Sequence, residues 1–259
     1  MKTELESAVI LVTGAAAGIG RAIAEHAASE GVAGLFLTDS DEAGLGEVAE
    51  ALMGQTQVHC HAADLGDPKA PAAIFEHAKA QFGSVTGLVN SAGITSRASF
   101  TDGTADLWDR LFAVNARAPY LLMSAFITDA VARQTGGTIV NIQSMNAHCG
   151  APDLAIYAST KGALQTLTKN AANAHLMDRI RVNGINLGWT LTDAEDKMQT
   201  ATHRAGADWA QASGAGLPLG RLIVPDEAAR LAIYLLSPAS APMTGISLDL
   251  EQSVVGAPR

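Results

Sequence analysis

The sequence predicts an α/β protein with one parallel sheet that is covered by helices on both faces. Short apolar runs of strand length alternate along the 259 residues with longer stretches of helical spacing, and this alternation is typical of right-handed β–α–β crossovers. The runs are almost continuously apolar, as expected for strands that are buried on both sides. The expected strands cover residues 8–13, 34–39, 57–62, 87–90, 138–143 and 181–186.

Glycine and proline mark the ends of the expected helices. The first helix should cover residues 19–29, directly after the first strand. A long helix should begin near Thr104 and should be broken by the two glycines at 136–137. A late helix should begin at Pro225, because proline suits the first helical position and the two acidic residues after it suit the first turn.

The segment 189–220 differs from these β–α units. It is rich in Ala, Gly, Thr and charged residues, with weak amphipathic spacing over residues 193–205. Long segments of this kind are often functional, so we expect a helical excursion that serves as a substrate lid. A surface insertion with no role is the alternative. No repeat or linker divides residues 1–259, and we therefore expect a single domain.

The composition narrows the class of protein. Apolar residues make up 48% of the chain, enough for one large core, and we expect no run long enough to cross a bilayer. A formal net charge of −9 argues against nucleic acid, since phosphate binding needs a basic surface. Cys60 and Cys149 are far apart and imply no disulfide framework. The polar residues 1–7 lack the features of a secretory signal, so we expect a cytoplasmic protein without a membrane partner.

The glycine-rich segment 13–20 is the first candidate binding site. It follows an expected strand and opens an expected helix, which is the context that a dinucleotide fingerprint requires. Gly14 permits a tight turn, Gly18 lets the backbone approach a pyrophosphate, and Gly20 allows close packing of helix on strand. The helix N-terminus then offers N–H groups to the anion. An ordinary flexible turn is the alternative.

Asp39 supports a dinucleotide and indicates which one. It ends the second expected strand, about twenty residues after the last motif glycine, where an acidic side chain hydrogen-bonds the adenosine ribose hydroxyls. A 2′-phosphate there would meet like charge, and neither segment 15–17 nor segment 40–42 contains Arg or Lys. The sequence therefore favours NAD(H) over NADP(H).

Tyr157 and Lys161 are the candidates for proton chemistry. Residues four apart share a helix face, with Cβ atoms roughly 5–6 Å apart, so the Lys161 ammonium can lie beside the Tyr157 phenol. We expect Lys161 to lower the Tyr157 pKa, which is ~10 in an unperturbed tyrosine. A surface tyrosine with a solvated lysine is the alternative, and the surrounding motifs decide between the two interpretations.

A metal site is not expected. His59 and His61 lie on an expected strand and point to one side of it, whereas Cys60 points to the other side, so the three side chains cannot converge on one ion. His148 and Cys149 have no second Cys or His at ligand spacing.

Several motifs, in this order and spacing, resemble the short-chain dehydrogenase/reductase family over residues 8 to about 250. The resemblance implies a Rossmann-type doubly wound seven-stranded parallel sheet, a nicotinamide cofactor and a homotetramer. Similar proteins pair through helices that correspond to 104–132 and 154–174, which makes Trp108 and His175 interface candidates. The motifs are the glycine turn, Asp39, Asp64 with Leu65, the run 90–93, Asn115, Ser144 and the pair of Tyr157 and Lys161.

The resemblance also implies roles for single residues. Ser144 would stabilise charge on the substrate oxygen, Tyr157 would pass the proton, and Lys161 would lower the Tyr157 pKa and bind the nicotinamide ribose. Asn115 would hold a water that links Lys161 to solvent. The residues expected to bind the cofactor are Gly14, Ala17, Gly18, Ile19, Gly20, Asp39, Asp64, Leu65, Asn90, Ala92, Gly93, Tyr157, Lys161, Gly188, Thr190 and Thr192.

The residues expected to face the substrate are mostly polar, which favours a hydroxylated ligand, and the chain is similar in outline to family members that oxidise sugars or polyols. We therefore expect an NAD-dependent oxidoreductase that interconverts a secondary alcohol and a ketone by hydride transfer, on a sugar or polyol. A 3-oxoacyl-carrier-protein-type reductase and a catalytically silent NAD(H)-binding regulator are the alternatives. The expected substrate-facing residues are Met145, Asn146, His148, Asp153, Trp189, Glu195 and His203.

The end of the chain departs from the family pattern at Glu251 and Gln252. Their added polar groups are expected to reach either a substrate pocket or a subunit interface.

Overall fold

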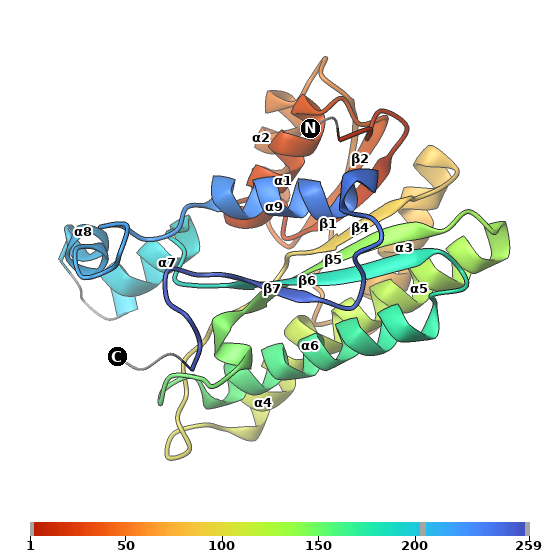
Figure 1. Cartoon of the computed structure of the whole chain (residues 1–259). Coiled ribbons are helices and arrows are strands. Elements are labelled where there is room, and N and C mark those ends of the chain that lie inside the picture. Colours follow the sequence, from red (N-terminus) through yellow and green to blue (C-terminus); the bar gives the residue numbers. More distant parts are fainter. Residues whose placement is uncertain (1–2, 203–205, 257–259) are drawn as a thin grey trace.

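The computed structural model describes residues 3–202 and 206–256. In this part of the chain the strands are β1 (Val9–Thr13), β2 (Gly34–Asp39), β3 (Gln57–Ala62), β4 (Gly87–Asn90), β5 (Gly137–Ser144), β6 (Ile180–Leu187) and β7 (Ser247–Leu250). They form one seven-stranded sheet in the order β3-β2-β1-β4-β5-β6-β7, and all neighbouring pairs are parallel (Figure 1). The predicted Rossmann-type doubly wound sheet is confirmed.

The six strands expected from their apolar runs lie within one residue of the predicted bounds. β7 has no such run, because its residues alternate between polar and apolar and none of them is fully buried. It pairs only with β6, so it is an edge strand. The family resemblance implies this strand, whereas apolar patterning does not reveal it.

Helices cover both faces of the sheet. On one face are α1 (Gly18–Ser29), α2 (Glu42–Ala51) and α9 (Pro225–Leu236). On the other are α3 (Ala70–Phe82), α5 (Ala118–Arg133) and α6 (Ala155–Ala174), with α4 (Ala105–Phe112) beside α6 (Figure 1). Short 3-10 turns cover Met145–Ala147 and Pro238–Ser240.

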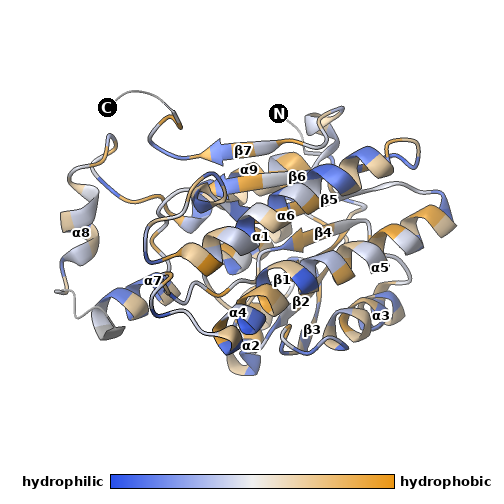
Figure 2. Cartoon of the chain, turned by 90° about the horizontal axis from the view of Figure 1, so that it is seen from below, coloured by the Kyte–Doolittle hydropathy of each residue, from blue (hydrophilic) through white to orange (hydrophobic). Residues whose placement is uncertain are grey.

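The two faces bury separate apolar cores. Ile10 and Val12 of β1 belong to the core under α1 and α9, and Leu11 belongs to the core under α5 and α6, as the alternation of side chains along a strand requires. Apolar and polar residues are interspersed along the covering helices (Figure 2), which is consistent with helices that pack one face on the sheet.

The long helix expected from Thr104 is divided by a π-helical turn, Ala113–Arg117. Its start is as predicted, because Thr104 Oγ1 accepts a hydrogen bond from Leu107 N at 3.2 Å. It ends earlier than predicted, at Arg133, where Gln134 takes a left-handed conformation with φ of 57°. The helix has therefore ended before the two glycines, and the second of them, Gly137, begins β5.

The helical run Ala105–Arg133 corrects one expectation. By length and composition it is apolar enough to cross a membrane, whereas we expected no such run. However, 61% of its most apolar window is buried inside the protein. Its apolar residues are therefore those of a core helix packed between the sheet and its neighbours.

The segment 189–220 contains α7 (Asp193–Lys197), a π-helical turn (Met198–Thr202) and α8 (Trp209–Gly214). It follows the carboxyl end of β6, and α8 lies apart from the sheet in both views (Figures 1 and 2). A β-bridge and the side chain of Gln252 are among the contacts that attach it to the chain around it. Thr190 forms a β-bridge with Ile223, and Gln252 bonds both Leu219 N and Arg221 O at 2.8 Å. Gln252 therefore contacts this segment.

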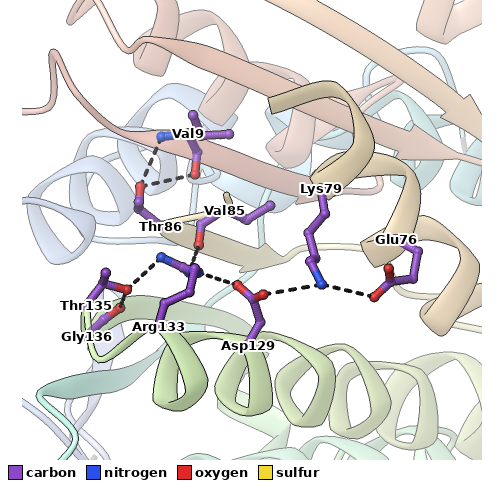
Figure 3. A network of polar contacts seen from close by, with 9 residues as sticks. All are labelled: Val9, Glu76, Lys79, Val85, Thr86, Asp129, Arg133, Thr135 and Gly136. Atoms are coloured by element: carbon purple, nitrogen blue, oxygen red, sulfur yellow. Dashed lines mark hydrogen bonds and ion pairs between the residues drawn. The ribbon is translucent and has the colours of Figure 1, made fainter. Parts of the chain in front are cut away.

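A polar network ties the helices together at the amino ends of the strands (Figure 3). Asp129 of α5 bonds Arg133 at 2.6 Å and lies 3.3 Å from Lys79 of α3. Arg133 in turn donates to Val85 O, just before β4, at 3.0 Å. The strand amino ends are thus occupied by structural contacts, and the opposite end of the sheet carries the predicted site.

Candidate active site

The predicted site residues gather at the carboxyl ends of the strands. Gly14 follows β1, Asp39 ends β2, Asn90 ends β4, Ser144 ends β5 and Gly188 follows β6. The strand order reverses between β1 and β4. In open α/β sheets, ligands bind in the crevice at such a switch point.

The glycine turn is built by close approaches of backbone to backbone. A Cβ at Gly14 would lie 2.7 Å from Ala92 Cα, and a Cβ at Gly20 would collide with the Gly14 carbonyl group. Gly14 and Gly18 have positive φ, of 67° and 55°, which glycine adopts without strain. The first turn of α1 has neither a side-chain cap nor an acidic residue, so its N–H groups suit an anion.

A groove of about 370 Å³ extends from this turn past Asp39. The Asp39 carboxylate accepts hydrogen bonds from Ala16 N and Asp41 N, both at 3.1 Å, so it is held in place beside the turn. An uncapped helix N-terminus next to a fixed carboxylate fits the pyrophosphate and ribose of a dinucleotide. Of the predicted cofactor residues, Gly14, Ala17, Gly18, Ile19, Gly20, Asp39, Asp64, Leu65, Ala92, Gly93 and Thr192 line this groove.

Five predicted cofactor residues, Asn90, Tyr157, Lys161, Gly188 and Thr190, do not line the groove. Asn90 is buried and donates to Asn141 Oδ1 at 2.8 Å. Thr190 Oγ1 donates to Gly188 O at 3.0 Å, and a Cβ on Gly188 would collide with the Glu251 carboxylate. Asn90, Gly188 and Thr190 support the loops around the groove.

Sequence reasoning missed a cation in the groove. Arg110 lines it and pairs with Asp64 at 2.9 Å. A hydrogen bond from Gly66 N and the pairing with Arg110 both lower the Asp64 pKa. No local motif marks Arg110, because it comes from α4, 46 residues away from its partner.

Ser144 is held so that its hydroxyl can donate a hydrogen bond. The backbone N–H and the side-chain amide of Asn146 both donate to Ser144 Oγ, at 3.1 and 3.2 Å. Both contacts use the oxygen as the acceptor, so the hydroxyl hydrogen is left for another partner. Asn146, predicted to face the substrate, is therefore a direct neighbour of Ser144.

Tyr157 and Lys161 lie on the buried face of α6, next to the end of β5. Both are less than one-tenth exposed. Lys161 Nζ is 5.7 Å from the centre of the Tyr157 ring and donates to Ile142 O at 2.9 Å. The solvated surface pair, the alternative considered from sequence, is excluded.

Burial determines the proton affinities of this pair in the chain alone. It raises the pKa of Tyr157 to about 12, against an opposing hydrogen bond with Ser144 and with a further rise from the charge of Glu195. Burial also lowers the pKa of Lys161 to about 8. The expected lowering of the Tyr157 pKa is therefore wrong for the chain alone, because desolvation of the phenolate is the largest effect on it and raises it.

Asn115 connects helix α6 to the predicted cofactor groove. It lies in the π-helical turn, a feature frequent at functional sites. Its Oδ1 accepts from Ile94 N and its Nδ2 donates to Ile94 O, both at 2.9 Å, and Nδ2 also contacts Thr160 Oγ1 at 3.2 Å. The side chain thus joins the loop after β4 to α6, and its predicted water-holding role stays a prediction.

Gly93 is the point where the groove meets Lys161 of the predicted catalytic pair. Gly93 lines the groove, and a Cβ on it would lie 3.5 Å from both Lys161 Nζ and Asn115 Oδ1. The buried lysine is therefore adjacent to the predicted cofactor site, as the proposed chemistry requires.

Comparison with known proteins agrees with this geometry. A family profile described as enoyl-(acyl carrier protein) reductase matches residues 14–251. The chain belongs to the short-chain dehydrogenase/reductase family. It is therefore a nicotinamide-dependent oxidoreductase of the class that acts on CH–OH groups.

Two curated relatives and one solved structure of this family illustrate its range. The chain is 34% identical to 2-(S)-hydroxypropyl-CoM dehydrogenase 3 of Xanthobacter autotrophicus, over 97% of this chain and 98% of the relative. It is 32% identical to L-rhamnose 1-dehydrogenase (NAD(P)(+)) of a Sphingomonas species, over 94% of each. L-sorbose reductase of Gluconobacter frateurii, complexed with NADPH and L-sorbose, superposes with a TM-score of 0.93 at 27% identity, over 99% of this chain and 100% of the other.

Four further substrate-facing candidates of this dehydrogenase/reductase fall into two groups. Trp189, Glu195 and Asp153 lie in a polar cluster that includes Arg97, which sequence reasoning missed. His148 points to the edge strand β7 instead and contacts Asp249 of that strand at 3.0 Å. Asp249 also accepts from Asn186 at 2.8 Å. His203 lies outside the described residues.

The histidines and cysteine of β3 contact their neighbours without forming a metal centre among the described residues. His59 packs edge-on against Phe82, and His61 packs against His77 with ring centres 4.3 Å apart. Cys60 and Cys149 are exposed free thiols.

Proposed function

We propose that this chain is an NAD(H)-dependent dehydrogenase that interconverts a secondary alcohol and a ketone on a sugar or polyol. The observation that carries the proposal is the arrangement of Tyr157 and Lys161, buried together beside Gly93 of the dinucleotide groove. Relatives named as rhamnose, galactitol and galactose dehydrogenases support the substrate class.

In the proposed mechanism, the residues around the groove would hold a nicotinamide cofactor, which would supply the hydride chemistry. Ser144, with Oγ fixed by two donors from Asn146, donates a hydrogen bond to the substrate oxygen and stabilises the charge that develops there. Tyr157 takes the hydroxyl proton during oxidation and returns it during reduction. Lys161, adjacent to Gly93, would hold the nicotinamide ribose.

The pKa of about 12 for Tyr157 gives the cofactor a second role in this proposal. Burial alone keeps the phenol protonated, so the chain is ready for reduction, in which Tyr157 donates. Oxidation needs the phenolate, and the positive charge of an oxidised nicotinamide ring would favour it. Binding of the oxidised cofactor would thus couple to the proton affinity of the base.

The preference for NAD(H) over NADP(H) rests on Asp39. Its carboxylate is held within the groove and would repel a 2′-phosphate. The L-sorbose reductase neighbour is described with NADPH, so cofactor choice differs within this structural group. Wild-type protein should turn over NAD⁺ at least about tenfold better than NADP⁺, and Asp39→Ala combined with Ser40→Arg should reverse the ratio. Wild-type preference for NADP⁺ would refute the assignment.

The test of the substrate class is a panel of polyols, aldoses and short hydroxy compounds, followed by cofactor absorbance. Turnover of polyols or sugars is the expected result. Activity restricted to acyl thioesters would support the 3-oxoacyl-carrier-protein-type reductase instead. Cofactor binding without turnover of any alcohol or carbonyl compound would support the silent regulator.

We also propose a cytoplasmic homotetramer. The hollow between α5 and α6, of about 510 Å³, is lined by Phe112, Tyr120 and Leu167. Trp108 beside it is 46% exposed and stacks on Phe112. Light scattering of the purified protein should give the mass of four chains, and Trp108→Asp should lower it. A monomeric wild-type protein would contradict the proposal.

A further inference from the structure

Three segments that are far apart in the sequence meet near Tyr157. They are the loop after β4, the loop after β5 and helix α7. The first two are joined by backbone: Ala98 N donates to Asp153 O at 2.8 Å, and Ala155 N donates to Ala98 O at 3.2 Å. This bridge lies just before Tyr157 in α6, so it places the Arg97 and Asp153 side chains near the catalytic end of that helix.

Helix α7 contributes Glu195 to the same place. Glu195 Oε1 accepts from Trp189 Nε1 at 2.9 Å and from Gln199 Nε2 at 2.8 Å. Arg97 Nη2 lies 3.8 Å from this oxygen, while Arg97 Nη1 bonds Asp153 at 2.8 Å. One carboxylate oxygen is thus fixed from three sides, whereas Glu195 Oε2 has no hydrogen-bond partner among the described residues.

The charge of Glu195 acts on the reacting end of the site. It raises the pKa of Tyr157, which shows that the carboxylate and the phenol are electrostatic neighbours. The Glu195 side chain is only 13% exposed, so its charge is weakly screened. Arg97 faces two carboxylates, so its positive charge is shared between Asp153 and Glu195.

We propose that Glu195 is a specificity-determining residue that accepts a hydrogen bond from a second hydroxyl of the substrate, with Arg97 as its positioning residue. This deepens the proposed function and rests on it. A fixed, partly desolvated carboxylate binds a hydroxyl strongly, and a substrate that lacks this hydroxyl leaves the acceptor unpaired. The same negative charge disfavours substrates with an anionic substituent. The site therefore selects uncharged polyhydroxy compounds.

The experiment uses three substrates of similar size with the full-length protein and NAD⁺. Butane-2,3-diol and butan-2-ol differ by one hydroxyl, and 3-hydroxybutanoate carries a negative charge. Wild-type kcat/KM should be at least about tenfold higher for the diol than for butan-2-ol. Glu195→Gln, which keeps the size of the side chain, should lower kcat/KM for the diol about tenfold, leave butan-2-ol within about twofold, and raise kcat/KM for 3-hydroxybutanoate.

The matched control is Asp196→Asn, on the same helix turn. This exposed carboxylate bonds Trp209 Nε1 through Oδ1 at 2.7 Å, a contact that the amide oxygen keeps, so the variant should leave all three substrates unchanged. Arg97→Met should lower kcat/KM for the diol through KM, and Arg97→Lys should restore most of it. A general loss of structure in segment 189–220 would instead lower kcat/KM for all three substrates together in every variant.

Two results would overturn the inference while the proposed function stands. One is a wild-type protein that oxidises the diol and butan-2-ol equally well. The other is a Glu195→Gln variant that changes all three substrates by the same factor. A wild-type protein that oxidises no alcohol in this set or in the polyol and sugar panel overturns the proposed function, and the inference falls with it.

Discussion

The cofactor side and the substrate side of this site are built in different ways. The cofactor side relies on closely packed backbone: Gly14 lies against the Ala92 backbone, and the N–H groups of Ser91 and Ala92 are held by the neighbouring Thr13 Oγ1 at 3.1 Å. The substrate side relies on side chains from three segments, centred on Arg97 and Glu195. The cofactor side therefore depends on local chain geometry, whereas the substrate side depends on tertiary assembly.

If this comparison holds, removing the group between the two sides should stop chemistry without affecting cofactor binding. Tyr157→Phe should lower kcat by about 10²–10⁴-fold, since it removes the general acid–base group. The NADH dissociation constant, measured by fluorescence titration, should stay within about twofold, because the groove does not use the phenol oxygen. Ser159→Ala, an exposed position on the same helix, is the control. Near wild-type turnover by Tyr157→Phe would refute the catalytic role.

Burial of Lys161 provides a second test, because the free energy that this burial costs the folded chain should depend on pH. The folded-state pKa of Lys161 is about 8, below the usual lysine value of 10.5, so the folded chain binds fewer protons than the unfolded chain between these values. Stability should therefore rise with pH through this window. In cofactor-free protein, Lys161→Met should be more stable than wild type at neutral pH by up to about 3 kcal/mol. The gap should close towards pH 10 in urea denaturation, and a constant gap would contradict burial of the charge.

The backbone character of the cofactor side can be tested with two glycines. Gly14→Ala adds a methyl group at φ of 67° against the Ala92 backbone, and it should lower the free energy of unfolding by about 2 kcal/mol and weaken NADH binding. Gly46→Ala lies in α2 with nothing within 4 Å of its Cβ and should be neutral or stabilising by up to about 1 kcal/mol. Equal effects of the two substitutions on stability would contradict the tight backbone packing of the cofactor side.

The smallest expected effect concerns the tail. Gln252 holds the chain after α8 through two hydrogen bonds, to Leu219 N and Arg221 O. Gln252→Ala should raise the substrate KM a few-fold, corresponding to about 1 kcal/mol for exposed hydrogen bonds. The NADH dissociation constant should not change, because the tail does not line the groove. A loss of NADH affinity would show that the two sides are not independent.

The sequence by itself determined the sheet and the cofactor side. Apolar runs located six strands, because strands buried on both faces allow few polar residues. The glycine turn and Asp39 were readable because each glycine satisfies a local steric demand. Apolar patterning did not locate β7, because an edge strand with one open side keeps polar residues.

Tertiary structure alone decided what surrounds the chemistry. The division of the long helix by a π-helical turn places Asn115 against Ile94, and no local pattern announces it. Arg97 and Arg110 find their partners across 56 and 46 residues. The expectation that the Tyr157 pKa is lowered was wrong for the same reason. The spacing shows that a lysine is near, but burial, which raises the free energy of the phenolate, exists only once the chain has folded.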